Sequence, residues 1–143
     1  MNDKKTILER ASEFFPHVET HVDVSGTNRK FVLNLREVGS DGGYVVRAIE
    51  LEVKNGYEFE AYSETNPFNA LAIVRSKIRR GLAIKYLSLE NECNALRFDE
   101  FQGRIGYGGV IIDGQFIPFT ELCEILQVYE GFSINVSITD PTS

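Results

Sequence analysis

The chain has 143 residues, of which 43% are hydrophobic and 25% charged, and its formal net charge is −6 at pH 7. This length and composition predict one soluble globular domain over residues 1–143, with a frayed tail at 140–143. The acidic balance argues against nucleic acid as the main partner, because neutralising phosphates requires clustered cations. No apolar run approaches the roughly 18 residues of a membrane span, and Cys93 and Cys123 have neither metal nor redox spacing. We therefore expect a reduced, cytoplasmic protein.

The first half of the chain predicts four antiparallel strands between His17 and Glu64. A helix ends before Pro16, and glycine-containing loops then separate segments in which apolar and polar residues alternate. We expect this meander to have one apolar and one charged face. In the first strand the apolar side would carry Val18, Val22 and Val24, and the polar side His17, Glu19, His21 and Asp23.

The segment 49–61 alternates apolar and acidic residues on both arms of a predicted hairpin. A three-residue loop, 54–56, would pair Val53 with Tyr57 and extend that register along both strands. This register places four glutamates on one face: Glu50, Glu52, Glu58 and Glu60. The face could bind a divalent cation or a basic protein partner. We favour a solvated surface, and a basic partner over a metal, because side chains on a flat strand diverge.

A long helix should follow from Pro67 to about Leu89, capped by Asn66. Its main apolar stripe recurs at steps of three and four and should cover the sheet: Leu71, Val74, Ile78, Leu82, Tyr86 and Leu89. A smaller strip lies roughly opposite and comprises Ile73, Ile84 and Leu87. A helix that is apolar on two sides is usually sandwiched. We therefore predict self-association, as a homodimer, through this second strip.

The same helix carries several basic residues and no acidic residue between Glu64 and Glu90. Its cations should point away from the glutamates and leave the molecule electrically two-sided. Arg75 is different, because an arginine inside an apolar stripe must find a carboxylate, a carbonyl or a bound anion. A structural pair is the favoured reading. The alternative is a ligand pocket between sheet and helix, with Arg75, Tyr62 and Tyr86 at its wall.

Catalytic and metal sites receive little support from the sequence. The polar residues of the first strand could ligate zinc, but alternate strand residues lie roughly 7 Å apart, which is wide for chelation by neighbours. The glycine-rich segment 103–109 precedes a strand, whereas a phosphate cradle needs a helix there. The two histidines and two cysteines form no nucleophile constellation. We expect no metal and no cofactor, and favour a protein without enzymatic activity.

The last third returns to short elements. Asp113 and Gly114 predict a two-residue hairpin turn, a helix should run from Thr120 to about Glu130, and a strictly alternating strand should follow Gly131. The order of an IIDG hairpin, a TELCEILQVYEGF helix and a strand ending in ITD resembles an uncharacterised bacterial family, a domain of unknown function with an "IDG…EL…YEGF…I.D" pattern. The GYEFEAY and KIRRGLAIKYL segments are similar too. Small orphan proteins of this kind travel on mobile integron gene cassettes, and the resemblance implies a shared fold but no activity.

Together the patterns predict an α+β fold: a single curved antiparallel sheet packed on one long central helix, with two shorter helices. The favoured function is a non-enzymatic binding or interaction protein that self-associates. The alternative is a small-molecule-binding protein, or a small hydrolase- or isomerase-type enzyme, with its pocket between sheet and helix. A weaker possibility is a regulator that binds a basic protein through the glutamate face.

Overall fold

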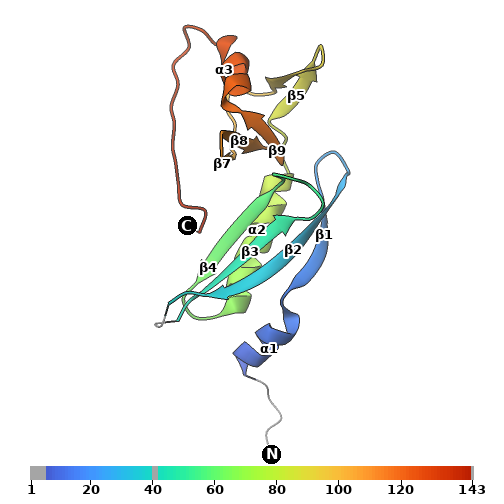
Figure 1. The fold of residues 1–143 in the computed structure, drawn as a ribbon, viewed down its shortest axis with the longest axis vertical. Coiled ribbons are helices and arrows are strands. Elements are labelled where there is room, and N and C mark those ends of the chain that lie inside the picture. The colour runs from blue at the N-terminus through green and yellow to red at the C-terminus, as the bar shows by residue number, and fades with distance from the viewer. Residues whose placement is uncertain (1–5, 40–41, 143) are drawn as a thin grey trace, which may run out of the picture.

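Three antiparallel sheets and three helices build residues 6–39 and 42–142, the part of the chain described by this computed structural model (Figure 1). The first sheet has four strands in chain order: β1 (His17–Val22), β2 (Asn28–Glu37), β3 (Tyr44–Glu50) and β4 (Glu58–Ser63). The predicted four-stranded meander is therefore confirmed. Two further sheets contain β5 (Leu87–Glu90) with β6 (Cys93–Leu96), and β7 (Arg104–Gly106) with β8 (Gly109–Ile112) and β9 (Gln115–Pro118).

The prediction of a single sheet packed on one long central helix is wrong. The long helix, α2 (Pro67–Leu82), stops seven residues before the predicted end, and the chain continues into β5. Asp113, in the β8–β9 turn, gives the reason. Its carboxylate accepts hydrogen bonds from the backbone N–H groups of Tyr86 and Leu87 at 2.8–3.0 Å, and so holds these residues outside the helix. The later strands then form two sheets of their own.

Helix α2 begins where local capping predicts, whereas the last helix begins at Phe119 with no side-chain cap, before the predicted cap Thr120. Asn66 accepts a hydrogen bond from the N–H of Phe68 at 2.8 Å, and Pro67 occupies the first turn of α2. The shorter helices are α1 (Ile7–Phe14) and α3 (Phe119–Gln127). None of the helices in these residue ranges combines the length and apolar character that crossing a membrane would require.

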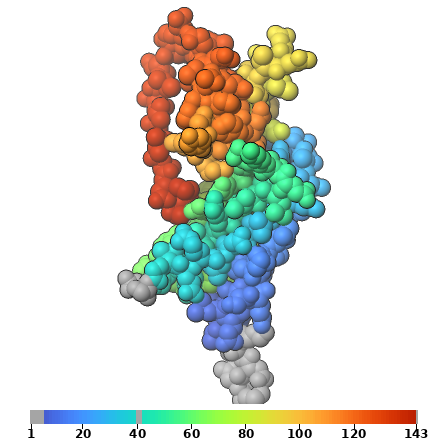
Figure 2. All heavy atoms as spheres, viewed as in Figure 1, coloured from blue at the N-terminus to red at the C-terminus, as the bar shows by residue number. Residues whose placement is uncertain are grey.

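Buried apolar side chains form two clusters. The first uses residues up to Leu82, at the end of α2, and the second uses residues from Tyr86 onward. In the N-terminal lobe, residues 6–83, α2 packs on one face of the four-stranded sheet around Phe31, Leu33, Val74 and Ile78. In the C-terminal lobe, residues 84–131, Leu87, Ile112, Ile117 and Ile125 form a smaller cluster. Figure 2 shows the two lobes stacked along the long axis of the molecule. The expectation of one domain over 1–143 stays a prediction.

The side of β1 that faces α2 is its polar side, whereas the apolar side was predicted to face the helix. Glu19 is paired with Phe31 of β2, so its side chain shares the face that α2 covers. Val18 and Val22 point to the outer face, where 54% and 62% of their surfaces are exposed. β1 is an edge strand, and an arginine of α2 lies beside it and pairs with Glu19. That ion pair offsets the burial of a polar strand side.

The predicted register of the β3–β4 hairpin is also wrong. Strand β3 pairs Ile49 with Glu58 and Val46 with Ala61, and the connection runs from residue 51 to residue 57 rather than over three residues. An odd shift in register turns alternate side chains to opposite faces. Glu50 therefore faces α2 with 5% of its surface exposed, whereas Glu58 and Glu60 face outward.

The C-terminal segment, residues 132–139, forms no strand, although a strand was predicted here. It leaves α3 at Gly131 and runs as an extended chain along the side of the molecule (Figures 1 and 2). At its far end the carbonyl oxygen of Pro141 accepts a hydrogen bond from Lys77 Nζ at 2.7 Å. Ser143, the last residue of the predicted frayed tail, lies outside the described residues.

The two lobes meet where the β8–β9 turn faces the β3–β4 connection. Gly114 has a φ of +72°, and a Cβ at this position would lie 2.6 Å from the ring of Tyr57. Beside this contact, Arg104 pairs with Glu58 at 3.0 Å and donates to the carbonyl of Gly56 at 3.4 Å. Glycine is therefore required here both by the backbone and by the close approach of the other lobe.

Gly114→Ala should lower the free energy of unfolding more than Gly108→Ala does. Gly108 also has a positive φ, +78°, but a Cβ there meets nothing within 4 Å. Left-handed strain alone should cost about 1–2 kcal/mol, and the clash with Tyr57 should add roughly 1–3 kcal/mol. Urea unfolding of both variants measures the difference. Equal losses would contradict the proposed packing of the lobes.

Candidate functional site

The charged side of β1 and one side of α2 form an ion cluster. Arg75 donates to both carboxylate oxygens of Glu19, from Nη2 at 2.8 Å and from Nε at 3.1 and 3.2 Å. The Nε2 atoms of His17 and His21 lie 3.3 and 3.1 Å from the same carboxylate. Burial alone would raise the pKa of Glu19, but hydrogen bonds from Arg75 and His21 outweigh it and lower that pKa. The cluster thus holds an ionised carboxylate among three basic side chains.

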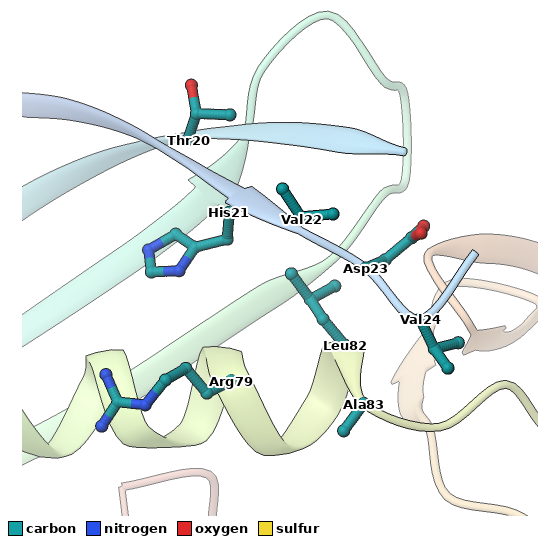
Figure 3. Close-up of a pocket in the computed structure, with 8 residues that line it drawn as sticks. All are labelled: Thr20, His21, Val22, Asp23, Val24, Arg79, Leu82 and Ala83. Atoms are coloured by element: carbon teal, nitrogen blue, oxygen red, sulfur yellow. The ribbon is translucent and has the colours of Figure 1, made fainter. Parts of the chain in front are cut away.

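Next to this cluster a groove of about 520 Å³ opens between β1 and the C-terminal end of α2 (Figure 3). Its walls are Thr20, His21, Val22, Asp23, Val24, Arg79, Leu82 and Ala83. The imidazole of His21 and the guanidinium of Arg79 extend toward the same end of the opening, while the carboxylate of Asp23 points away from it. A hydrogen bond of 2.9 Å from the N–H of Val24 to the carbonyl of Leu82 joins the two elements at the other end.

Arg79 is the exposed cation of this groove. Among the residues that the structure describes, it makes no ion pair, whereas Arg75 one turn earlier is bound to Glu19. The guanidinium of Arg79 can donate hydrogen bonds to the oxygen atoms of an anionic group, whereas Nε2 of His21 is already engaged with Glu19. The groove can therefore hold a small molecule that carries a carboxylate or phosphate.

A second polar cluster is buried at the end of the sheet nearest the C-terminal lobe. Asp23 accepts hydrogen bonds from the N–H groups of Ser25 and Thr27 at 2.9 and 3.0 Å, and from Arg29 Nε at 3.1 Å. Arg29 Nη1 also donates to Glu50 at 3.0 Å. The other Glu50 oxygen accepts the N–H of Tyr57 at 3.1 Å. The chain Asp23–Arg29–Glu50 thus ties the β1–β2 connection to the β3–β4 connection.

Every polar atom of the buried Asp23 carboxylate is engaged, which makes this cluster structural. Burial would raise the pKa of Asp23, but the hydrogen bonds from Ser25, Thr27 and Arg29 lower it well below its ordinary value. A folded-state pKa below the unfolded value means that the charged form stabilises the fold. This contribution is complete above the unfolded pKa and is lost as the pH falls through the folded pKa.

The three predicted ligand-binding residues lie apart from one another. Arg75 faces β1, and its guanidinium stacks over Phe14 with 5.8 Å from Cζ to the ring centre. Tyr62 lies on the opposite, outer face of the sheet at β4. Tyr86 packs against the core of the C-terminal lobe. Arg75 does not line the groove, and it forms a structural pair, the reading that the sequence analysis favoured, with Glu19 as its partner.

The predicted acidic face is divided. Glu50 is buried against Arg29, and Glu52 lies exposed in the β3–β4 connection. Glu58 contacts Arg47 and Arg104, and Glu60 lies 3.5 Å from Arg47. A basic partner would therefore find only two of the four glutamates on one face, each already next to an arginine of this chain.

The predicted self-association residues are divided between surface and core. Ile73 and Ile84 are each 43% exposed, but Leu87 is buried in the C-terminal lobe. The basic residues of α2 do not all point away from the sheet either. Arg75 turns to β1, and Lys77 Nζ donates to the carbonyl of Glu60 in β4 at 2.8 Å. The two edges of the sheet thus bind Arg75 and Lys77, while Arg79 and Arg80 stay exposed on α2, and the expected two-sided charge stays a prediction.

Sequence reasoning named the residues of the Glu19 cluster but missed the role of Asp23 and did not single out Arg29 or Arg79. Asp23 was grouped with the strand residues, although the following Ser-Gly-Thr is typical of a turn in which an aspartate binds backbone N–H groups. No local signal identifies Arg29 or Arg79, because their surroundings come from distant segments. Within residues 6–39 and 42–142, no group of three or more His, Cys, Asp or Glu side chains is placed to hold a metal ion.

Two family models match the chain, and their boundary lies at the end of α2. Residues 13–83 match a family described as a domain of unknown function, DUF7686, and residues 84–143 match another domain of unknown function, DUF7713. The boundary coincides with the division between the two apolar clusters. No curated protein and no solved structure matches the chain. The chain is thus covered by two domains of unknown function, which agrees with the resemblance to an uncharacterised family.

Asp23→Asn should destabilise the protein and flatten its acid response. Arg29 keeps its pair with Glu50, but an asparagine offers a single acceptor oxygen, so either Arg29 Nε or the N–H groups of Ser25 and Thr27 lose their acceptor, at roughly 1–3 kcal/mol for each buried donor left unsatisfied. Urea unfolding at neutral and acidic pH should show the largest loss at neutral pH, because acid already removes the contribution of the carboxylate in the parent protein. Asp99→Asn is the control, since Asp99 is exposed. An equal response of the two variants would refute the role of Asp23.

Proposed function

We propose that this protein is a non-enzymatic binding protein that self-associates. The observation that carries the proposal is the amount of apolar side chain left uncovered in two places. The outer face of β1 exposes Val18 and Val22, and the C-terminal segment exposes four large apolar side chains: Phe132, Ile134, Val136 and Ile138. Contiguous uncovered apolar surface marks an interaction site more often than a solvated one.

The polar clusters support a binding role over a catalytic one. The carboxylates of Asp23 and Glu50 are occupied by hydrogen bonds, and that of Glu19 is shared among Arg75 and two imidazoles. A catalytic acid or base needs an open side toward a substrate. A cytoplasmic location, and kinship with bacterial proteins carried on gene cassettes, remain expectations that accompany this proposal.

A second candidate function is the binding of a small anionic molecule in the groove between β1 and α2. The observation that favours it is the exposed guanidinium of Arg79, which lines the same groove as His21 and the apolar Leu82. Pockets of small ligands commonly combine apolar walls with a few convergent polar groups. The two candidates use different surfaces and can both hold.

Self-association should appear as a molar mass that rises with concentration above the 16.1 kDa of one chain. Because the surfaces involved are apolar, the dimer should persist in high salt, which screens charged contacts. Sedimentation equilibrium over a hundredfold range of concentration, in low and high salt, measures this. A constant mass of one chain at every concentration would rule the proposal out.

Arg79→Gln should weaken the binding of a phosphate or citrate probe in the groove by about tenfold, the loss expected for one charged hydrogen bond. Arg80→Gln is the matched control, because Arg80 follows on the same helix but does not line the groove. Amide chemical shifts of residues 20–24 during a titration provide the readout. Equal affinity of the two variants, or no shifts at these residues, would eliminate the groove as the site.

A further inference from the structure

We infer that the C-terminal segment is a donated β-strand, which pairs with the open edge of β4 in a second copy of the chain. This inference rests on the proposed self-association and names the surfaces that produce it. The segment alternates apolar residues with neutral polar residues, Ser133, Asn135, Ser137 and Thr139, which is the pattern of a strand with one buried face. Its apolar side chains are 70–76% exposed, so that face has no cover in a single chain.

The edge of β4 is built to receive such a strand. In the described part of the chain β4 pairs only with β3. The N–H of Glu50 donates to the carbonyl of Tyr57, so the odd-numbered residues of β4 bond to β3 and the even-numbered residues direct their backbone groups outward. Lys77 occupies the outward carbonyl of Glu60. The remaining outward groups, on Glu58, Glu60 and Tyr62, can form a new ladder with an added strand.

The side chains beside this edge fit an apolar face. Phe59 and Ala61 of β4 turn toward α2, and Ile73, one helical turn before Lys77, lies half exposed on the side of α2 that borders β4. The other open edge, β1, is a poorer match on this side of the sheet. There Glu19 and His21 face α2 and surround Arg75. An apolar strand face would remove those charges from water without replacing their contacts.

The reach of the chain favours a second copy over the same copy. Figure 1 shows the segment descending from α3 past the C-terminal strands, with only its last residues at the level of α2 and β4. Pro141 is the residue that reaches Lys77 and the β4 edge. The segment is already extended, and an extended chain spans at most about 3.3–3.6 Å per residue. Residues 132–139 therefore cannot slide down to β4 of their own chain while α3 holds their start.

Reciprocal exchange also provides enough contact area for a stable dimer. Covering one large apolar side chain removes roughly 60–120 Å² of apolar surface. Two segments contribute eight such side chains, and the surfaces they cover contribute a similar area. The total reaches the range of roughly 1,200–2,000 Å² that is typical of specific interfaces. A single segment bound to one site would bury about half of this.

A matched pair of variants tests the inference in the full-length protein. Val136→Asp places a charge on the apolar face of the segment and should raise the dissociation constant of the dimer by about 100-fold. Ser137→Asp adds the same charge on the other face, on the side of Glu58 and Glu60, and this like-charge contact should change it by less than about fivefold. Sedimentation equilibrium measures both. If the parent protein forms dimers but the two variants weaken them equally, the strand exchange is refuted while self-association stands. If the parent protein stays a monomer, both proposals fall.

Amide hydrogen exchange, followed by NMR at two concentrations, locates the new ladder independently. The amides of Glu60 and Tyr62 should become protected as the dimer forms, together with alternate amides of residues 132–139. Those of Phe59 and Ala61 should be protected at both concentrations, because they already bond to β3. Protection that appears on β1 instead, or that does not change with concentration, would overturn the assignment to β4 of a second copy.

Discussion

The buried ion chain from Asp23 through Arg29 to Glu50 is the constraint on which the rest of the structure depends. It requires Glu50 to face the helix, although an acidic residue in an alternating strand would otherwise face solvent. That single requirement fixes the register of β3 against β4, because side chains alternate strictly along a strand. It also sets the length of the β3–β4 connection, from which Tyr57 reaches the C-terminal lobe. Register, sheet faces and lobe contact therefore share one electrostatic origin.

A second ion pair reverses the exposed side of the edge strand β1. Because Arg75 on α2 holds Glu19, the polar side of β1 turns inward and its valines turn outward. The groove beside His21 and the apolar outer surface are two results of that one reversal. Hydrophobicity alone would bury the valines of β1. The ion pair between Arg75 and Glu19 instead leaves them on the surface, where they are available for binding.

The sequence was sufficient for features that depend on neighbouring residues. The capped start of α2 at Asn66, the four-stranded meander and the turn at Gly114 follow from local preferences of the backbone. It was insufficient where partners come from distant segments. The end of α2 depends on a carboxylate 27 residues away from Tyr86, and the inward direction of Glu50 depends on Arg29, 21 residues earlier. Periodicity describes one strand or helix at a time, so it cannot identify such partners.

The candidate sites also differ in how far the sequence alone could identify them, because their partners lie at different distances along the chain. Arg75 could be recognised from sequence as a cation that needed a partner, because its own helix surrounds it with apolar residues. Arg79 could not be distinguished from its basic neighbours until β1 was placed beside it. The C-terminal segment was recognised as a strand by its alternation, yet in a single chain it has no ladder to join.

The contacts of Asp113 also bear on the order in which the protein acquires structure during synthesis. The sheet and helix of the N-terminal lobe use residues up to 83 for their own core, so that core can close while later residues are still being added at the ribosome. Tyr86 and Leu87, by contrast, must wait for a carboxylate that is made 26 or 27 residues later. The nascent chain should thus mature in two stages, with β5 set in place only after the β8–β9 turn has emerged.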